Sequence, residues 1–241
     1  SFPYYFNIST DKELLFTPTF NYGGGIDSSQ RFNFDYNQIL SGGNFKSDLT
    51  FDSNFENENN NKWLNDASLI TKYNKNLNKN YRIKFDSAIE TSKSYIQRTK
   101  PNDKLSYTNS LSTNLNIEGF NLIKLDDQLS LKLNFYQTNQ ENEDNKTIPI
   151  VLPKIKYFSG YTYKFGNLHN YTLEFYNIFR EKGTEVHSKN QQKISHKYNV
   201  KKELLSFNSK ISLDAEIYNQ AFNTEDKLIN NNNYKTGTYY R

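Results

Sequence analysis

The chain has 241 residues and a formal net charge of +4, with 30 basic and 26 acidic side chains. Only 35% of the residues are hydrophobic, and no stretch approaches the ~20 consecutive apolar residues that a membrane-spanning helix needs. Composition therefore excludes a helical membrane protein. The 19 tyrosines and 18 phenylalanines argue against disorder, because disordered chains are poor in aromatic residues. The basic excess is spread thinly along the chain, so nothing favours binding to nucleic acid.

Two residue types are missing from the sequence. It has no cysteine, which excludes a disulfide framework and a thiolate metal site within this chain. It has no methionine either, even at position 1, and no apolar signal segment at its start. We therefore expect the chain to be a piece of a longer protein.

The chain begins SFPYYFNISTDKELLFTPTFNY, which is typical of two β-strands, 2–9 and 13–22, joined by a polar turn. Each strand contains a proline, Pro3 or Pro18, although proline has no amide hydrogen to donate to a sheet. A turn centred on residues 10–11 would place Pro3 directly opposite Pro18. Both prolines would then weaken the same position of the ladder.

Apolar and polar residues alternate with a period of two along most of the remaining chain. In YRIKFDSAIE at 81–90, for example, aromatic and aliphatic side chains fall on one face and charged side chains on the other. No run at helical spacing is convincing, and Gly166–Asn167 is predicted to form a two-residue hairpin turn. The alternation predicts strands at 2–9, 13–22, 31–38, 44–54, 66–77, 80–94, 104–118, 128–137, 151–165, 168–181, 187–200, 203–219 and 233–241.

The lengths of these segments separate two classes of all-β protein. Strands of soluble sheets are usually about 5–6 residues long, whereas a strand tilted across a bilayer needs about 9–11 residues. Many segments here alternate for ten residues or more, and their polar faces suit a water-filled lumen. We predict an all-β fold, an antiparallel meander forming part of a large transmembrane outer-membrane β-barrel. Residues 1–241 would be one partial barrel domain of twelve or thirteen strands, and a large soluble sheet with one wet face is the alternative.

Residues that carry catalysis or bind metals are not arranged for either role. The three histidines, His169, His187 and His196, have neither metal-ligand spacing nor nearby acidic partners. An embedded hydrolase would need a Ser–His pair, which these scattered histidines do not favour. The acidic loop at 141–145 is better explained as solvated than as a cation site. We predict no enzyme, no cofactor and no metal.

Two stretches of the sequence resemble one known family. PYYFNIS…LLFTPTFNYGGG resembles the start of the barrel in the LptD (OstA-type) family, which assembles lipopolysaccharide in the Gram-negative outer membrane. The stretch VLPKIKYFSGYTYKFGNLHNYTLEFYNIFREKGTE resembles a segment from the middle of that barrel. Together the stretches cover about a quarter of the chain and keep the family's order. The matching residues are Pro3, Tyr4, Tyr5, Asn7, Ile8, Thr17 and Pro18, then Leu152, Pro153, Ile155, Tyr157, Asn177, Arg180, Gly183 and Thr184.

The resemblance implies a function and a set of partners. Lipopolysaccharide would be inserted into the outer leaflet through a lumen and a lateral gate near the first strands, at Pro3, Tyr4 and Pro18. A periplasmic N-terminal domain, missing here, would receive the lipid from an LptA-like bridge protein, and an LptE-like lipoprotein would plug the lumen. The strands that close the barrel are also missing. Candidate residues that face the lumen and pass the saccharide are Arg82, Lys84, Lys132, Lys164 and Lys210.

Two other functions and one point of topology stay open. A porin or substrate-specific receptor barrel would share the periodicity but gives no role to the two prolines, and a β-rich surface adhesin would be soluble without detergent. The sidedness is also open. Barrels usually have their long loops outside the cell, whereas entry from a periplasmic domain would place the opposite turns outside. The long connections are predicted at 55–64, 95–103, 138–149 and 220–232.

Overall fold

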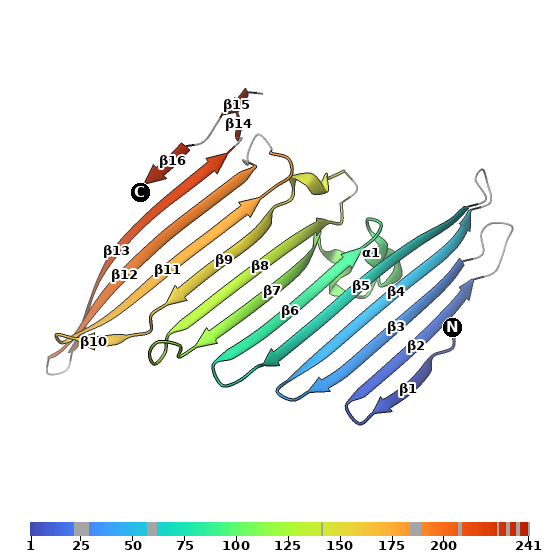
Figure 1. The fold of residues 1–241 in the computed structure, drawn as a ribbon, viewed down its shortest axis with the longest axis horizontal. Helices are drawn as coiled ribbons and strands as arrows, with labels where there is room; N and C mark the ends of the chain where they lie inside the picture. Colours follow the sequence, from blue (N-terminus) through green and yellow to red (C-terminus); the bar gives the residue numbers. More distant parts are fainter. Residues whose placement is uncertain are drawn as a thin grey trace. The chain divides into compact units, whose positions relative to one another are not determined.

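The computed structural model describes most of the chain, and most of what it describes is antiparallel β-strand (Figure 1). The described residues are 1–21, 29–56, 62–140, 142–183, 189–206, 209–225, 227–229, 232–234 and 237–240. The predicted connection at 55–64 lies partly outside these ranges, and so does the final predicted strand at 233–241.

The strands follow one another in the sheet in nearly the same order as in the sequence. The order is β1 to β9, then β11, β12, β13 and β16, while β10 pairs with β11, and β14 and β15 form a separate pair. The predicted all-β antiparallel meander is confirmed, and β1 and β16 stand at the two ends of the order. The bounds are β1 Tyr4–Ser9, β2 Lys12–Asn21, β3 Ser29–Leu40, β4 Gly43–Glu56, β5 Lys62–Asn76, β6 Tyr81–Glu90, β7 Ser110–Phe120, β8 Gln128–Thr138, β9 Ile150–Phe158, β10 Thr162–Lys164, β11 Asn167–Phe179, β12 Asn190–Ser206, β13 Ser209–Glu225, β14 Lys227–Ile229, β15 Asn232–Tyr234 and β16 Gly237–Tyr240.

The contacts divide the chain into two compact units, which are described separately below. Unit 1 contains residues 1–76, 83–114 and 136–145, and unit 2 contains residues 77–82, 115–135 and 146–241. The prediction of a single domain stays a prediction.

In unit 1, the register of β1 to β5 sorts the side chains into an aromatic face and a polar face. One row of directly opposed residues crosses all five strands, from Tyr4 through Phe16, Phe34 and Leu49 to Leu69. The rings of Phe16 and Phe34 stack with their centroids 4.8 Å apart, a geometry that adds about 0.5–1.5 kcal/mol to the burial of the rings. Of the neighbouring rows on the other face, one contains Thr17, Asn33, Thr50 and Ser68, and the other contains Asp35 and Asp48 together with Tyr5, Leu15 and Ile70.

Unit 2 has the same division into an apolar and a polar face. Its central apolar row runs from Leu131 through Ile155, Phe175 and Ile194 to Ala221. Ile194, in the middle of this row, is 50% exposed. The alternation that predicts the strands is therefore the alternation between two real faces.

The segment between β6 and β7 differs from its predicted structure. The sequence predicts strands at 80–94 and 104–118, but β6 ends at Glu90 and β7 begins at Ser110. Between them lie a short helix, α1 (Tyr95–Thr99), and the 3-10 helix η1 (Lys104–Tyr107). A five-residue helix is too short to show helical periodicity, and the alternation at 104–107 imitates a strand.

Two further predictions are corrected between Ile150 and Phe179. The predicted strand 151–165 is broken after Phe158, where Gly160 has φ +66° and a Cβ atom would come within 2.8 Å of the Leu125 carbonyl oxygen. The predicted turn is one residue late. Phe165 and Gly166 both have positive φ, and Lys164 pairs with Asn167 across them. A type I′ turn needs two residues with positive φ in succession, so the turn lies at Phe165–Gly166.

The turn between the last two long strands also lies later than predicted. The sequence places it near 201–202, whereas β12 and β13 are each 17 residues long and pair continuously up to Ser206 and Ser209. The leucines before Ser206 continue the strand pattern, so the pattern alone gives no signal for where the first strand ends.

The turn between β7 and β8 is organised by a buried carboxylate. Asp127 is 1% exposed and accepts hydrogen bonds from the backbone N–H groups of Leu122, Ile123 and Lys124, at 2.6, 2.8 and 3.2 Å. Burial alone would raise the pKa of Asp127, but these three donors outweigh it and hold the pKa below its usual range. The carboxylate stays ionised and satisfies three backbone N–H groups of the turn.

Candidate functional site

The first hairpin, predicted to be a gate, has a register one residue away from the predicted one. Tyr4 lies opposite Phe16, because the pairing shifts by one residue between Asn7 and Ser9. Pro3 is therefore not opposite Pro18, and the prediction that the two prolines weaken the same position is wrong. A bulge of this kind adds one unpaired residue to a strand, and the alternation of YYFNIS does not reveal it.

The two prolines remove donors from two different sides of β1. The Phe2 N–H donates to the Pro18 carbonyl oxygen at 3.4 Å. In a strand, the N–H and C=O of one residue point to the same neighbouring strand, so the missing donor of Pro18 would have faced Phe2. By the same alternation, the missing donor of Pro3 would point away from β2, along the free edge of the sheet.

β1 is consequently a weakly held edge strand. It has only six residues, and all of them are exposed. Its described strand partner is β2 alone, and the contact between Phe2 and Pro18, just beyond the end of that ladder, lacks one donor. Tyr4, the third residue predicted for the gate, is 53% exposed and stacks on Phe16 with ring centroids 6.2 Å apart.

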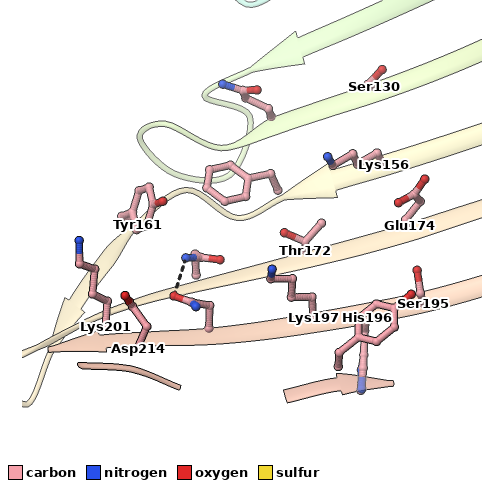
Figure 2. A pocket seen from close by; sticks show the side chains of 15 residues that line it. Ser130, Lys156, Tyr161, Thr172, Glu174, Ser195, His196, Lys197, Lys201 and Asp214 are labelled. Carbon is pink, nitrogen blue, oxygen red and sulfur yellow. Dashed lines mark hydrogen bonds between the residues drawn. The ribbon is translucent and has the colours of Figure 1, made fainter. Parts of the chain in front are cut away.

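A polar trough lies on one face of unit 2 and has a volume of about 860 Å³. Figure 2 shows that the side chains lining it come from successive strands. The Asn170 amide nitrogen donates to Asn199 Oδ1 at 3.4 Å, which is the dashed line in Figure 2. The trough is lined by five charged side chains, two amides and two tyrosine rings, among others: Lys156, Glu174, Lys197, Lys201, Asp214, Asn170, Asn199, Tyr161 and Tyr218.

Most of the charges in and beside the trough are paired. Lys197 lies 2.5 Å from Glu216, and Glu203 binds both Lys201 at 3.1 Å and Lys210 at 3.0 Å. Paired charges, amides and hydroxyls make a surface that hydrated polar solutes can cross without leaving a bare charge unsolvated. The trough therefore presents a hydrophilic surface of paired charges, amides and hydroxyls.

Three of the five predicted lumen cations lie on the face that forms the trough. Lys210 reaches the trough residue Lys201 through Glu203, and Lys132 lies two residues along β8 from Ser130, which lines the trough. Arg82 belongs to the same face, because it donates to Glu118 at 2.7 Å and a chain of hydrogen bonds leads from Glu118 to Ser130.

The remaining two predicted cations are placed differently. Lys84, in unit 1, is an even number of residues from Glu90 in β6 and therefore shares its face, which is the polar face of that unit. Lys164 pairs with Asn167 and thus shares the face of Tyr171, which is the apolar face. The break after Phe158 is what reverses its direction, because β9 and β10 pair with β11 in registers that differ by one residue.

Sequence reasoning missed the carboxylates that pair with these cations. Glu118, Glu203 and Glu216 each lie at a polar position of an alternating strand, so the pattern marks them as polar. Their roles as partners depend on register, which alternation leaves undetermined.

The described histidines lie apart from acidic groups. His169 Nδ1 is 2.7 Å from the Tyr198 hydroxyl, and His196 Nε2 is 3.0 Å from the Asn219 amide nitrogen. His187 lies outside the described residues. Within the part of the chain that the structure describes, no group of three histidine, cysteine or acidic side chains is placed to hold a metal ion.

The described chain contains only short helical segments, α1, η1 and η2 (Asn145–Thr147). Where the structure places them, none has the length and apolar character that a membrane-spanning helix requires.

No protein-family model matches the sequence, and no curated protein matches it.

Proposed function

We propose that the chain is part of an outer-membrane barrel of the LptD type, which inserts lipopolysaccharide into the outer leaflet through a lateral opening at β1. The proposal rests on the resemblance of PYYFNIS…LLFTPTFNY to the first barrel strands of that family. The observation that carries it furthest is the first hairpin, where two prolines remove donors beside the N-terminal end of one short edge strand.

The two faces of the strands support a membrane-spanning sheet. β2 to β8 have 10 to 15 residues each, and about 9–11 residues are enough for a tilted strand to cross a bilayer. The aromatic row from Tyr4 to Leu69 suits contact with lipid, and the trough of unit 2 suits a water-filled interior. The acyl chains of the lipid would stay on the aromatic side, and its saccharide would stay on the polar side.

The missing donor of Pro18 lowers the cost of separating β1 from β2. A backbone hydrogen bond contributes about 1 kcal/mol net in water, and an unsatisfied group costs more in lipid. The missing donor of Pro3 does the same for any strand that closes against the free edge of β1. The remaining partners in this proposal are a bridge protein of the LptA type and a plug lipoprotein of the LptE type.

Restoring the two donors is the experiment that tests this function. In the protein as its own cell makes it, Pro3→Val and Pro18→Val together should slow the arrival of new lipopolysaccharide at the cell surface. One restored bond per ladder is worth about 1 kcal/mol, so each substitution should slow release roughly fivefold. Thr19→Val is the matched control, because the Thr19 backbone pairs with β3 and already donates.

Pulse-labelling of the lipid, followed by its appearance in the outer leaflet, is the measurement. Unchanged delivery in the double variant would contradict a gate at β1. A porin or receptor barrel would then be favoured if the purified protein conducts ions without transferring lipid.

A further inference from the structure

The connection between β6 and β7, residues 91–109 and called the strap below, is folded onto the polar face of unit 1 and is not extended into solvent. Ile96 is fully buried and packs with Ala88 of β6 and Leu111 of β7, and Ile70 and Leu105 lie against this cluster. These residues are the only hydrophobic core cluster among the buried residues that the structure describes in this unit.

The beginning of the strap is fixed by hydrogen bonds to its backbone. The Glu90 carboxylate accepts from the N–H groups of Ser94 and Ile96 at 3.0 and 2.9 Å. Asn139 Oδ1 also accepts from the Ser94 N–H at 2.7 Å, and Lys93 Nζ donates to the Glu143 carbonyl oxygen at 2.6 Å. Bonds from the end of β6 and from the connection after β8 therefore hold this end of the strap in one position.

The rest of the strap brings two cations to an acidic surface. Three neighbouring rows of the polar face across β3 to β5 contain four aspartates and one arginine. The strap adds Lys100, which forms an ion pair with Asp48, and Arg98, which lies 3.5 Å from Asp66. The acidic residues are Asp35, Asp48, Asp52 and Asp66, and the arginine is Arg31.

Tyr95 lies at the centre of this contact and is 1% exposed. Burial raises the pKa of the Tyr95 phenol far above its usual value, and the neighbouring Asp52 adds to the effect. The phenol is therefore neutral at any physiological pH. It fills space between the strap and the charged rows without adding a further negative charge.

We propose that the strap is an internal plug, which closes the polar face of unit 1 to hydrated solutes and to the saccharide part of a lipid. The inference rests on the proposed function only in needing that face to border a water-filled passage, and it holds for any cargo. In this plug, Ile96 holds the strap on the sheet by apolar packing, and Lys100 is the latch, holding the strap by its ion pair with Asp48. Unit 2, where the trough is open, is then the unit whose polar face carries the cargo.

Conductance of the complete protein in planar lipid bilayers tests the plug. Lys100→Asp should raise about fivefold the fraction of time that the protein spends in a state of larger conductance. This is the change in the population of the open state that follows from losing an ion pair worth ~1 kcal/mol. The charge swap Asp48→Lys with Lys100→Asp should restore the parental conductance. Lys104→Asp is the control, because this substitution makes the same change of charge at an exposed position of the strap.

Ile96→Asp provides a second variant that does not depend on the latch, and cleavage by trypsin after Arg98 shows whether the strap is released. Release of the strap with parental conductance would overturn the plug while leaving the barrel intact. Absence of conductance in the parent and in every variant would contradict the barrel itself, and the plug with it. Increased conductance in Lys100→Asp and Ile96→Asp, but not in Lys104→Asp, is the expected result.

Discussion

Arg31→Leu should destabilise the sheet of unit 1 more than any other single change considered. Arg31 donates from Nε to Asp52 Oδ1 at 2.7 Å and from Nη2 to Oδ2 at 2.8 Å, and Asp52 is only 7% exposed. Removing the guanidinium leaves a buried carboxylate without its ion-pair partner. Such a loss costs about 3–5 kcal/mol in buried sites. The lower end applies here, because the Arg31 side chain keeps 36% exposure.

The double variant Arg31→Leu with Asp52→Leu is the control for this prediction. Replacing both members of a buried ion pair by apolar residues is often neutral, so most of the lost stability should return. Urea unfolding of the protein in detergent, followed by the intensity of its β-sheet circular dichroism, is the measurement. Equal unfolding midpoints for the parent and Arg31→Leu would show that the pair contributes nothing.

Phe16→Arg should prevent most of the protein from inserting into membranes. Phe16 lies in the middle of β2, and its ring stacks on those of Tyr4 and Phe34 within the aromatic row. If that row faces lipid, an arginine near mid-depth costs about 2–4 kcal/mol. On a sheet face in water, the same substitution would cost no more than the lost packing of one half-buried ring.

Thr17→Arg is the matched control, because it places the same side chain on the next residue of β2. Thr17 lies opposite Asn33 on the polar face, where an arginine meets water and carboxylates. Folding into lipid vesicles, assayed by protection from added protease, distinguishes the two variants. Equal insertion of both variants would contradict a lipid-facing aromatic row and would favour a soluble sheet.

The alternation in the sequence was sufficient to predict the all-β antiparallel meander and most of its strands. A period of two determines which side chains of a strand share a face, and Arg82, Lys132 and Lys210 do lie on one face of unit 2. The period does not determine the register between neighbouring strands. The shift at Asn7–Ser9 and the break between β9 and β10 each move a strand by one residue. A shift of one residue reverses a face, and this accounts for the error at Lys164.

The strap lay beyond what the sequence could predict for a different reason. Its helix is five residues long, and what holds it in place is tertiary: the Glu90 carboxylate, the Asp48 ion pair and the Ile96 contacts. None of these interactions leaves a periodic signal. A polar connection that contains a tyrosine, an isoleucine and two cations resembles any solvated loop until the acidic rows opposite it are known.

A photo-crosslinking residue at Tyr4, placed in living cells of the source organism, tests the central claim most directly. Tyr4 is exposed on the edge strand beside Pro3, so its side chain should meet a lipid that leaves sideways at this edge. The account predicts a lipopolysaccharide adduct that disappears when transport from the inner membrane is blocked. Crosslinks only to phospholipid or to neighbouring strands, with lipid delivery still active, would contradict an exit at β1.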